Sequence, residues 1–142
     1  MAGWQESMGR TLVYGTINGA RASKEYSFLV DTGAIYIGLP FEEIQALGLT
    51  PIPDGKRRFV TATGPVELDT YTALGRIRGR GFSATVVPTP IPLIGYEILE
   101  SMRFRVNLVT QQLEEVPEDE LFPSYLLSIV EDSEGNQLGS SS

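Results

Sequence analysis

One short segment, Phe28-Leu-Val-Asp31-Thr32-Gly33-Ala34, decides how the rest of this sequence is interpreted. Three apolar residues, typical of a buried strand, are followed by a carboxylate, a hydroxyl and a residue without a Cβ atom. The carboxylate can simply hydrogen-bond its own backbone in an Asx turn. It can also be a reactive group that a strand holds in place at its end. An isolated Asp-Thr-Gly does not decide between these interpretations, so the surrounding sequence must.

The composition limits the available chemistry. The chain has 142 residues, of which 42% are hydrophobic and 20% are charged, as in one ordinary globular domain. It contains neither cysteine nor histidine, which excludes disulfides, thiolate nucleophiles, histidine-dependent triads and ordinary zinc sites. Any reaction must therefore depend on carboxylates, hydroxyls, lysine or arginine.

The charge is unevenly distributed along the chain. Residues 1–105 contain 11 Lys/Arg and 10 Asp/Glu, a net charge of +1, whereas residues 106–142 contain no basic and 8 acidic residues, a net charge of −8. A nearly neutral body with an acidic tail argues against a general nucleic-acid binder. The apolar stretch 121–130 is interrupted and too short to span a bilayer, and the N-terminus has no apolar signal core. We therefore predict a soluble, cytoplasmic protein with no nucleic-acid or membrane partner.

Hydrophobic patterning predicts an all-β barrel with one or two short helices. Runs rich in β-branched and aromatic residues predict strands over residues 11–17, 20–30, 34–39, 58–63, 66–74, 82–87, 104–109 and 113–116. Short helices are expected at 41–47 and 96–102. In the strand 66–74, alternation places five residues on one face: Val66, Leu68, Thr70, Thr72 and Leu74.

Three landmarks occur in order along the chain. The first is Leu29-Val-Asp-Thr-Gly-Ala-Ile-Tyr-Ile-Gly-Leu-Pro40, which is followed by the predicted helix. The second is a hairpin centred on Gly64, and the third is Pro92-Leu-Ile-Gly95-Tyr-Glu97-Ile-Leu99. Together they resemble the retropepsin-like aspartic protease family, most closely its bacterial and archaeal single-domain members. The resemblance covers about residues 11–117.

The resemblance implies a single-domain acid-protease β-barrel and assigns roles to four groups of residues. Asp31 would be catalytic. The loop around it would be supported by Thr32, Gly33 and Ala34. A mobile flap would cover the substrate, with its tip at Ala62, Thr63, Gly64 and Pro65. The third landmark would pack behind the loop through Ile94 and Gly95. No metal ion or other cofactor would take part.

One chain supplies only half of such a site. A water molecule attacks a peptide bond between two carboxylates that share one proton, the ionised one acting as general base and the protonated one as general acid. The chain contains no second Asp-Thr-Gly or Asp-Ser-Gly. The simplest completion is a two-fold homodimer in which the two Asp31 carboxylates meet at the axis, where Gly33 permits close backbone approach. The resemblance also implies that the Thr32 hydroxyls reach across to the partner loop.

We therefore predict an aspartic endopeptidase with an acidic optimum that cleaves peptides or unfolded proteins. Two positions depart from the family pattern, since Ile35 and Ile37 stand where relatives commonly have a polar residue and a threonine. These residues make the neighbourhood more apolar and favour bulky apolar substrate side chains, or they mark a slow or degenerate enzyme. The second hypothesis is therefore a catalytically weak peptide-binding or dimerisation module on the same fold.

Basic and acidic segments raise further questions. Clusters at 56–58 and 76–80 are expected to be solvated charge, or to meet the acidic tail, and a third hypothesis is that the arginines bind RNA or acidic lipid. An N-terminal arm (residues 1–10) precedes the predicted domain (11–117), and an acidic extension (118–142) follows it, with an end that is expected to be disordered. The apolar part of the extension can pack on the barrel, exchange between subunits or occupy the cleft.

Overall fold

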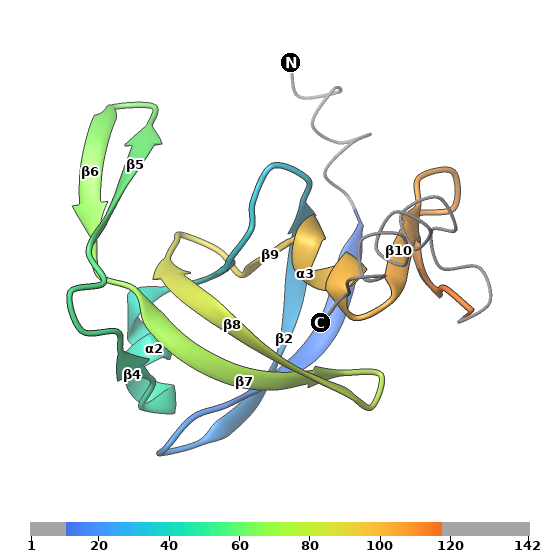
Figure 1. The fold of residues 1–142 in the computed structure, drawn as a ribbon, viewed down its shortest axis with the longest axis horizontal. Helices are drawn as coiled ribbons and strands as arrows, with labels where there is room; N and C mark the ends of the chain where they lie inside the picture. The colour runs from blue at the N-terminus through green and yellow to red at the C-terminus, as the bar shows by residue number, and fades with distance from the viewer. Residues whose placement is uncertain (1–10, 118–142) are drawn as a thin grey trace, which may run out of the picture.

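The computed structural model describes residues 11–117, which form a closed barrel of six strands with two short helices (Figure 1). The predicted all-β barrel is thus confirmed, while the predicted N-terminal arm and acidic extension lie outside the described residues. Within residues 11–117, no helix is long and apolar enough to cross a membrane. The elements are β1 (Leu12–Asn18), β2 (Ser23–Asp31), β3 (Ile37–Leu39), α2 (Phe41–Leu47), β4 (Thr50–Pro51), β5 (Arg57–Thr61), β6 (Gly64–Leu68), β7 (Tyr71–Ile77), β8 (Arg80–Pro88), β9 (Leu93–Gly95), α3 (Tyr96–Ser101), β10 (Phe104–Asn107) and β11 (Gln112–Glu115).

The barrel closes through a pairing between β1 and β7. The order around it is β1-β2-β9-β3-β8-β7, and residues 16–18 of β1 pair with residues 74–76 of β7 to complete the circle. Two pairs are parallel, β2 with β9 and β3 with β8, so these pairs join segments that are far apart in the sequence. The ends of β2 and β9 therefore lie side by side at one rim of the barrel.

Alternating side chains fill the core. On β1, Val13 and Ile17 are buried, whereas Leu12 and Tyr14 on the opposite face are exposed. Full burial of a large apolar side chain contributes roughly 1.5–3 kcal/mol to folding, so the interior holds the strands together. The largest fully buried side chains are those of Phe28, Phe104, Ile17, Ile37, Leu39, Ile44, Leu47, Ile77, Ile94 and Leu99.

Helix α2 has the features that its sequence predicts. Glu42 and Glu43 lie in its first turn, where negative charge interacts favourably with the helix dipole. Ile44 and Leu47 are buried against the barrel. Gly48 ends the helix in the left-handed conformation (φ 72°), with its N–H bonded to two carbonyl oxygens of the last turn.

The predicted strand 66–74 is two strands in the structure. β6 and β7 are separated by two residues, of which Thr70 is buried and donates a hydrogen bond from its hydroxyl to the carbonyl oxygen of Gly55 (2.7 Å). The break changes which face is buried, so β7 buries Ala73 and leaves Leu74 exposed. The prediction that Val66, Leu68, Thr70, Thr72 and Leu74 share one face is therefore wrong.

Gly75 allows three strands to approach closely. It lies opposite Phe82 of β8, and a Cβ atom at this position would be 2.5 Å from the Phe82 ring and 2.5 Å from the carbonyl oxygen of Thr16. Both distances are far below van der Waals contact. Gly81 lies in the same ladder but has space, because the nearest atom to its Cβ would be 3.8 Å away.

We expect Gly75→Ala to lower the free energy of unfolding by about 1–3 kcal/mol, because the methyl group forces the strands apart. Urea denaturation measures the change. Gly81→Ala is the matched control and should leave stability unchanged or raise it by about 0.5 kcal/mol. Equal losses in both variants would mean that the close approach at Gly75 is not the cause.

Candidate active site

Asp31 is the last residue of β2 and lies at the rim of the barrel. Its strand is anchored by the buried side chains of Phe28 and Val30, and the N–H of Val30 donates a hydrogen bond to the carbonyl oxygen of Thr11 (3.0 Å). Asp31 stands beside Gly95 in the parallel pairing of β2 with β9. The core therefore fixes the strand that carries this carboxylate.

Two hydrogen bonds to Asp31 close the turn that follows it. The N–H of Gly33 donates to Oδ1 of Asp31 (3.0 Å), and the N–H of Ala34 donates to its carbonyl oxygen (3.2 Å). The Asx turn that the sequence allowed is thus present. Among residues 11–117, Oδ2 of Asp31 has no hydrogen-bond partner. Asp31 is half-buried, Thr32 and Gly33 are exposed and Ala34 is buried, so the turn leaves its polar residues accessible.

The Asp31 loop (residues 31–36) rests on the backbone of Gly95. A Cβ atom at position 95 would lie 2.3 Å from the carbonyl oxygen of Ala34. The N–H of Gly95 donates a hydrogen bond to the carbonyl oxygen of Tyr36 (2.9 Å). The preceding Ile94 is fully buried between β2 and β3. The structure therefore brings the predicted pair Ile94 and Gly95 against this loop, where only glycine fits at position 95.

The predicted flap residues lie together at the free end of a separate hairpin, β5–β6, which projects from the barrel (Figure 1). Ala62 and Thr63 form its turn, between the paired residues Thr61 and Gly64. The Thr61 hydroxyl donates to the carbonyl oxygen of Gly64 (2.7 Å), and Gly64 has a φ of 119°, which residues with a side chain rarely adopt. Pro65 follows in β6.

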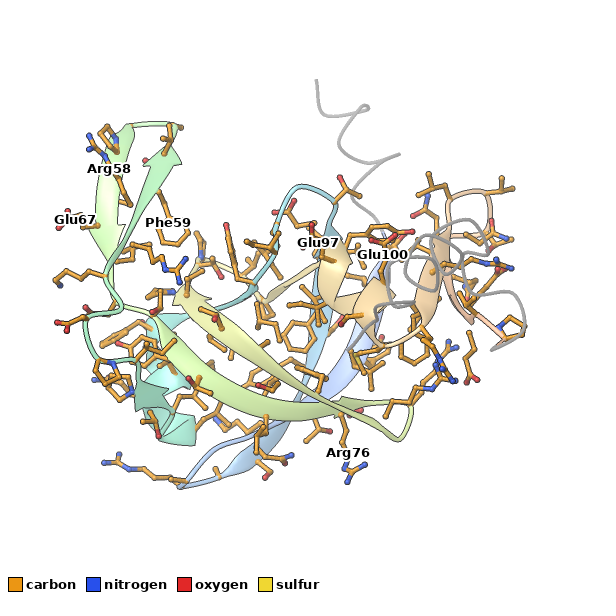
Figure 2. All side chains as sticks on the ribbon, viewed as in Figure 1. Arg58, Phe59, Glu67, Arg76, Glu97 and Glu100 are labelled. Carbon is orange, nitrogen blue, oxygen red and sulfur yellow. The ribbon has the colours of Figure 1, made fainter. Side chains whose placement is uncertain are left out.

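Two aromatic rings join this hairpin to the Asp31 loop. Phe59 of β5 and Tyr36 pack edge to face, with ring centroids 5.5 Å apart and an interplanar angle of 84°, a favourable geometry for an aromatic pair. In Figure 2, Phe59 points from the hairpin toward the barrel, whereas Arg58 and Glu67 lie on the other side. Our sequence analysis gave neither ring a role. The sequence signal that could have indicated this contact is that Tyr36 lies in the first landmark and Phe59 in the second.

Tyr36 also interacts electrostatically with Asp31. Burial, the larger cause, and the negative charge of Asp31 both raise the pKa of Tyr36 above the ordinary value for tyrosine. Both act in this direction because they disfavour the negatively charged phenolate. The phenol therefore stays protonated at neutral and acidic pH, where it can donate a hydrogen bond to a bound molecule.

The two isoleucines that depart from the family pattern have different surroundings. Ile35 is 64% exposed in the Asp31 loop, whereas Ile37 is fully buried in the core. Ile37 therefore cannot contact a substrate, and that part of the predicted apolar preference is wrong. Ile91 is a further exposed apolar residue that our sequence analysis missed. It precedes Pro92, whose carbonyl oxygen accepts a hydrogen bond from the N–H of Leu29 in β2 (3.1 Å).

The other aspartates within residues 11–117 have different environments. Asp69 forms an exposed ion pair with Lys56 (3.0 Å). Asp54 precedes β5 in a left-handed conformation (φ 53°). Within the same residues, no group of three or more acidic side chains could hold a metal ion. Each described chain thus offers one carboxylate of the Asp-Thr-Gly type.

A closed barrel with a carboxylate in a buttressed turn and a hairpin packed beside that turn has the architecture of an acid protease. The sequence profile of a family described as aspartyl protease matches residues 13–98. Since the matched residues make up more than half of the 142-residue chain, the chain belongs to the aspartyl protease family. No curated protein matches the chain.

Two solved structures resemble the fold. The protease of simian foamy virus (mac), solved in solution, is 20% identical; the match covers 63% of this chain and 91% of that one, with a TM-score of 0.48. The EIAV protease, solved with a bound inhibitor, is also 20% identical; the match covers 64% of this chain and 86% of that one, with a TM-score of 0.51. The predicted aspartic protease family is thus confirmed by the profile, and the predicted retropepsin-like fold by the EIAV protease.

Removal of the Asp31 charge should lower the pKa of Tyr36. Asp31→Asn keeps the shape of the side chain but removes the negative charge that opposes phenolate formation. NMR titration of ring-labelled tyrosine should show the Tyr36 midpoint at lower pH. Tyr26 is the internal control. Its pKa is raised by burial and by its hydrogen bond to Glu43 (2.7 Å), not by Asp31, so the substitution should leave it unchanged. Equal Tyr36 midpoints in both proteins would place its hydroxyl outside the field of Asp31.

Proposed function

We propose that this chain is an aspartic endopeptidase whose catalytic pair consists of Asp31 from two identical subunits. The main support is the carboxylate itself, which has one unpartnered oxygen among residues 11–117 and lies in a turn that Gly95 and the core hold in place. The described chain supplies one such group and the reaction requires two, so a second copy completes the site. Membership of the aspartyl protease family supports this type of chemistry.

In this mechanism the two carboxylates share one proton. The ionised carboxylate removes a proton from water as the water oxygen bonds to the peptide carbonyl carbon, and the protonated carboxyl gives its proton to the carbonyl oxygen. The first carboxyl then protonates the amide nitrogen while the second takes a proton from one hydroxyl of the intermediate. The C–N bond breaks, a carboxylic acid and an amine leave, and the pair returns to its starting state.

The substrate is an extended peptide between the β5–β6 hairpin and the Asp31 loop. A two-stranded hairpin has unpaired backbone edges, to which an extended chain can add by strand-like hydrogen bonds. Exposed apolar side chains on the loop and before β9, Ile35 and Ile91, favour apolar substrate residues. Unfolded proteins are therefore better substrates than compact ones.

The second candidate function is a peptide-binding module with little catalysis. It is favoured by Ile35, which is exposed in the Asp31 loop at a position where relatives commonly have a polar residue. Such a module keeps the fold and the hairpin but loses part of the polar environment of the carboxylates. Cleavage measurements separate the two candidates.

Asp31→Asn should reduce cleavage of an unfolded mixed-sequence protein by at least about a thousandfold, because an amide cannot transfer these protons. The assay runs from about pH 2 to pH 7 and detects fragments by mass spectrometry, with activity expected on the acid side, where a carboxylate pair retains its shared proton. Asp69→Asn is the matched control and should retain activity. If the folded wild-type protein cleaves no better than Asp31→Asn, the binding module replaces the enzyme.

Gly33→Ala tests the dimer. Among residues 11–117 of one chain, the only atom near a Cβ at position 33 would be Oδ1 of Asp31, at an ordinary 3.7 Å, so the barrel itself tolerates alanine. If two loops meet at the axis, the methyl group is excluded there, and the dimer dissociation constant should rise by at least about tenfold. Analytical ultracentrifugation measures the dissociation constant, and circular dichroism checks the fold. An active, equally dimeric Gly33→Ala protein would refute this arrangement of the loops.

A further inference from the structure

Four arginines gather where the turn between β7 and β8 meets the β10–β11 hairpin. This arginine corner consists of Arg78, Arg80, Arg103 and Arg105. Arg78 donates a hydrogen bond to the carbonyl oxygen of Leu113 (3.1 Å), and Arg80 donates to those of Met102 (2.8 Å) and Arg103 (3.2 Å). These contacts join segments that are distant in the sequence. In Figure 1 the turn between β7 and β8 and the β10–β11 hairpin lie on the side of the barrel away from β4.

Among residues 11–117, two ion pairs and a bond to a neutral oxygen describe the charge of the corner. Glu115 pairs with Arg80 (3.1 Å) and Glu114 with Arg105 (3.3 Å). Two of the four arginines thus form ion pairs with glutamates of β11. Since Arg78 is exposed and uses its contact on a neutral carbonyl oxygen, the corner retains a net attraction for further negative charge.

A surface pocket of about 450 Å³ opens beside these arginines. Two of them, Arg80 and Arg103, form part of its wall, while Phe82 and Met102 contribute apolar surface. Ser83 and Ser101 also line the pocket. The pocket therefore combines positive charge with an apolar surface, which suits a segment that carries carboxylates next to apolar side chains.

The chain leaves the described structure at this same place. The N–H of Val116 donates a hydrogen bond to the carbonyl oxygen of Arg103 (2.8 Å). Arg103 is also a residue of the pocket wall. After Pro117 the sequence continues with Glu118-Asp119-Glu120 and then with Leu121-Phe122. Residues 118–142 contain six acidic and no basic residues. Three extended residues span about 10 Å, so the first acidic residues begin within reach of the corner.

We propose that residues 118–126 bind the arginine corner and its pocket within the same chain. Glu118, Asp119 and Glu120 pair with the arginines, and Leu121 and Phe122 contact the apolar part of the pocket. Covalent attachment next to the pocket gives this segment a high effective concentration, which a separate acidic partner lacks. In this proposal the arginines bind the protein's own C-terminal extension rather than RNA or lipid. The proposal does not depend on catalytic activity.

Disulfide trapping in the full-length chain tests this placement, because the protein has no cysteine of its own. The test variant carries Ser83→Cys in the pocket and Ser124→Cys in the extension. The matched control combines Ser124→Cys with Ser23→Cys, an exposed position at the start of β2. Under mild oxidation, the intrachain disulfide should form at least about tenfold faster in the test variant. Equal rates in the two variants would overturn the proposal.

Charge variants then test whether the acidic residues 118–120 are the ones that the arginine corner attracts. Neutralising the first acidic group (Glu118→Gln, Asp119→Asn, Glu120→Gln) should slow trapping about tenfold, since three exposed ion pairs together amount to roughly that factor. Neutralising the second group (Glu131→Gln, Asp132→Asn, Glu134→Gln) changes the net charge equally and should have no effect. Equal slowing in both would refute specific pairing at 118–120. A disulfide between two chains, seen as a covalent dimer, would assign the pocket to a second copy instead.

Discussion

The contact between the backbone of Gly95 and the carbonyl oxygen of Ala34 is the constraint on which the site depends. Only a residue without a Cβ atom lets the Asp31 loop lie this close to β9. The contact is possible because β2 and β9 run in parallel and end side by side at the same rim. Burial of Phe28 and Ile94 fixes both strands. The position of the carboxylate is thus determined by the core rather than by the loop alone.

Much of the fold could be predicted because its signals are local. Strands over β1, β2 and β8 follow from runs of β-branched and aromatic residues, and α2 follows from its early glutamates and terminal Gly48. The strand 66–74 could not be predicted correctly, because its break depends on a tertiary contact. The Thr70 hydroxyl bonds a carbonyl oxygen fifteen residues away in the sequence, and no local pattern announces that bond.

The candidate site divides in the same way. The turn at Asp31, the glycine at 95 and the hairpin tip at Gly64 were predictable, since each depends on a residue type that few alternatives can replace. The pair of Tyr36 and Phe59 was not, because two ordinary aromatic residues become neighbours only after the hairpin folds over the loop. The burial of Ile37 likewise follows from the pairing of β3 with β8 and β9. Completion of the site by a second subunit is a property of two chains and stays a proposal.

The β5–β6 hairpin forms its own two-stranded sheet and shares no strand pairing with the barrel. Its sequence can therefore change without disturbing the barrel ladder, as long as the Phe59 ring still meets Tyr36. This makes the hairpin an exchangeable cassette for protein engineering. Libraries that keep Gly64 and vary the other residues of 60–66 on an unchanged scaffold would sample new peptide preferences while the folding of the barrel is left intact.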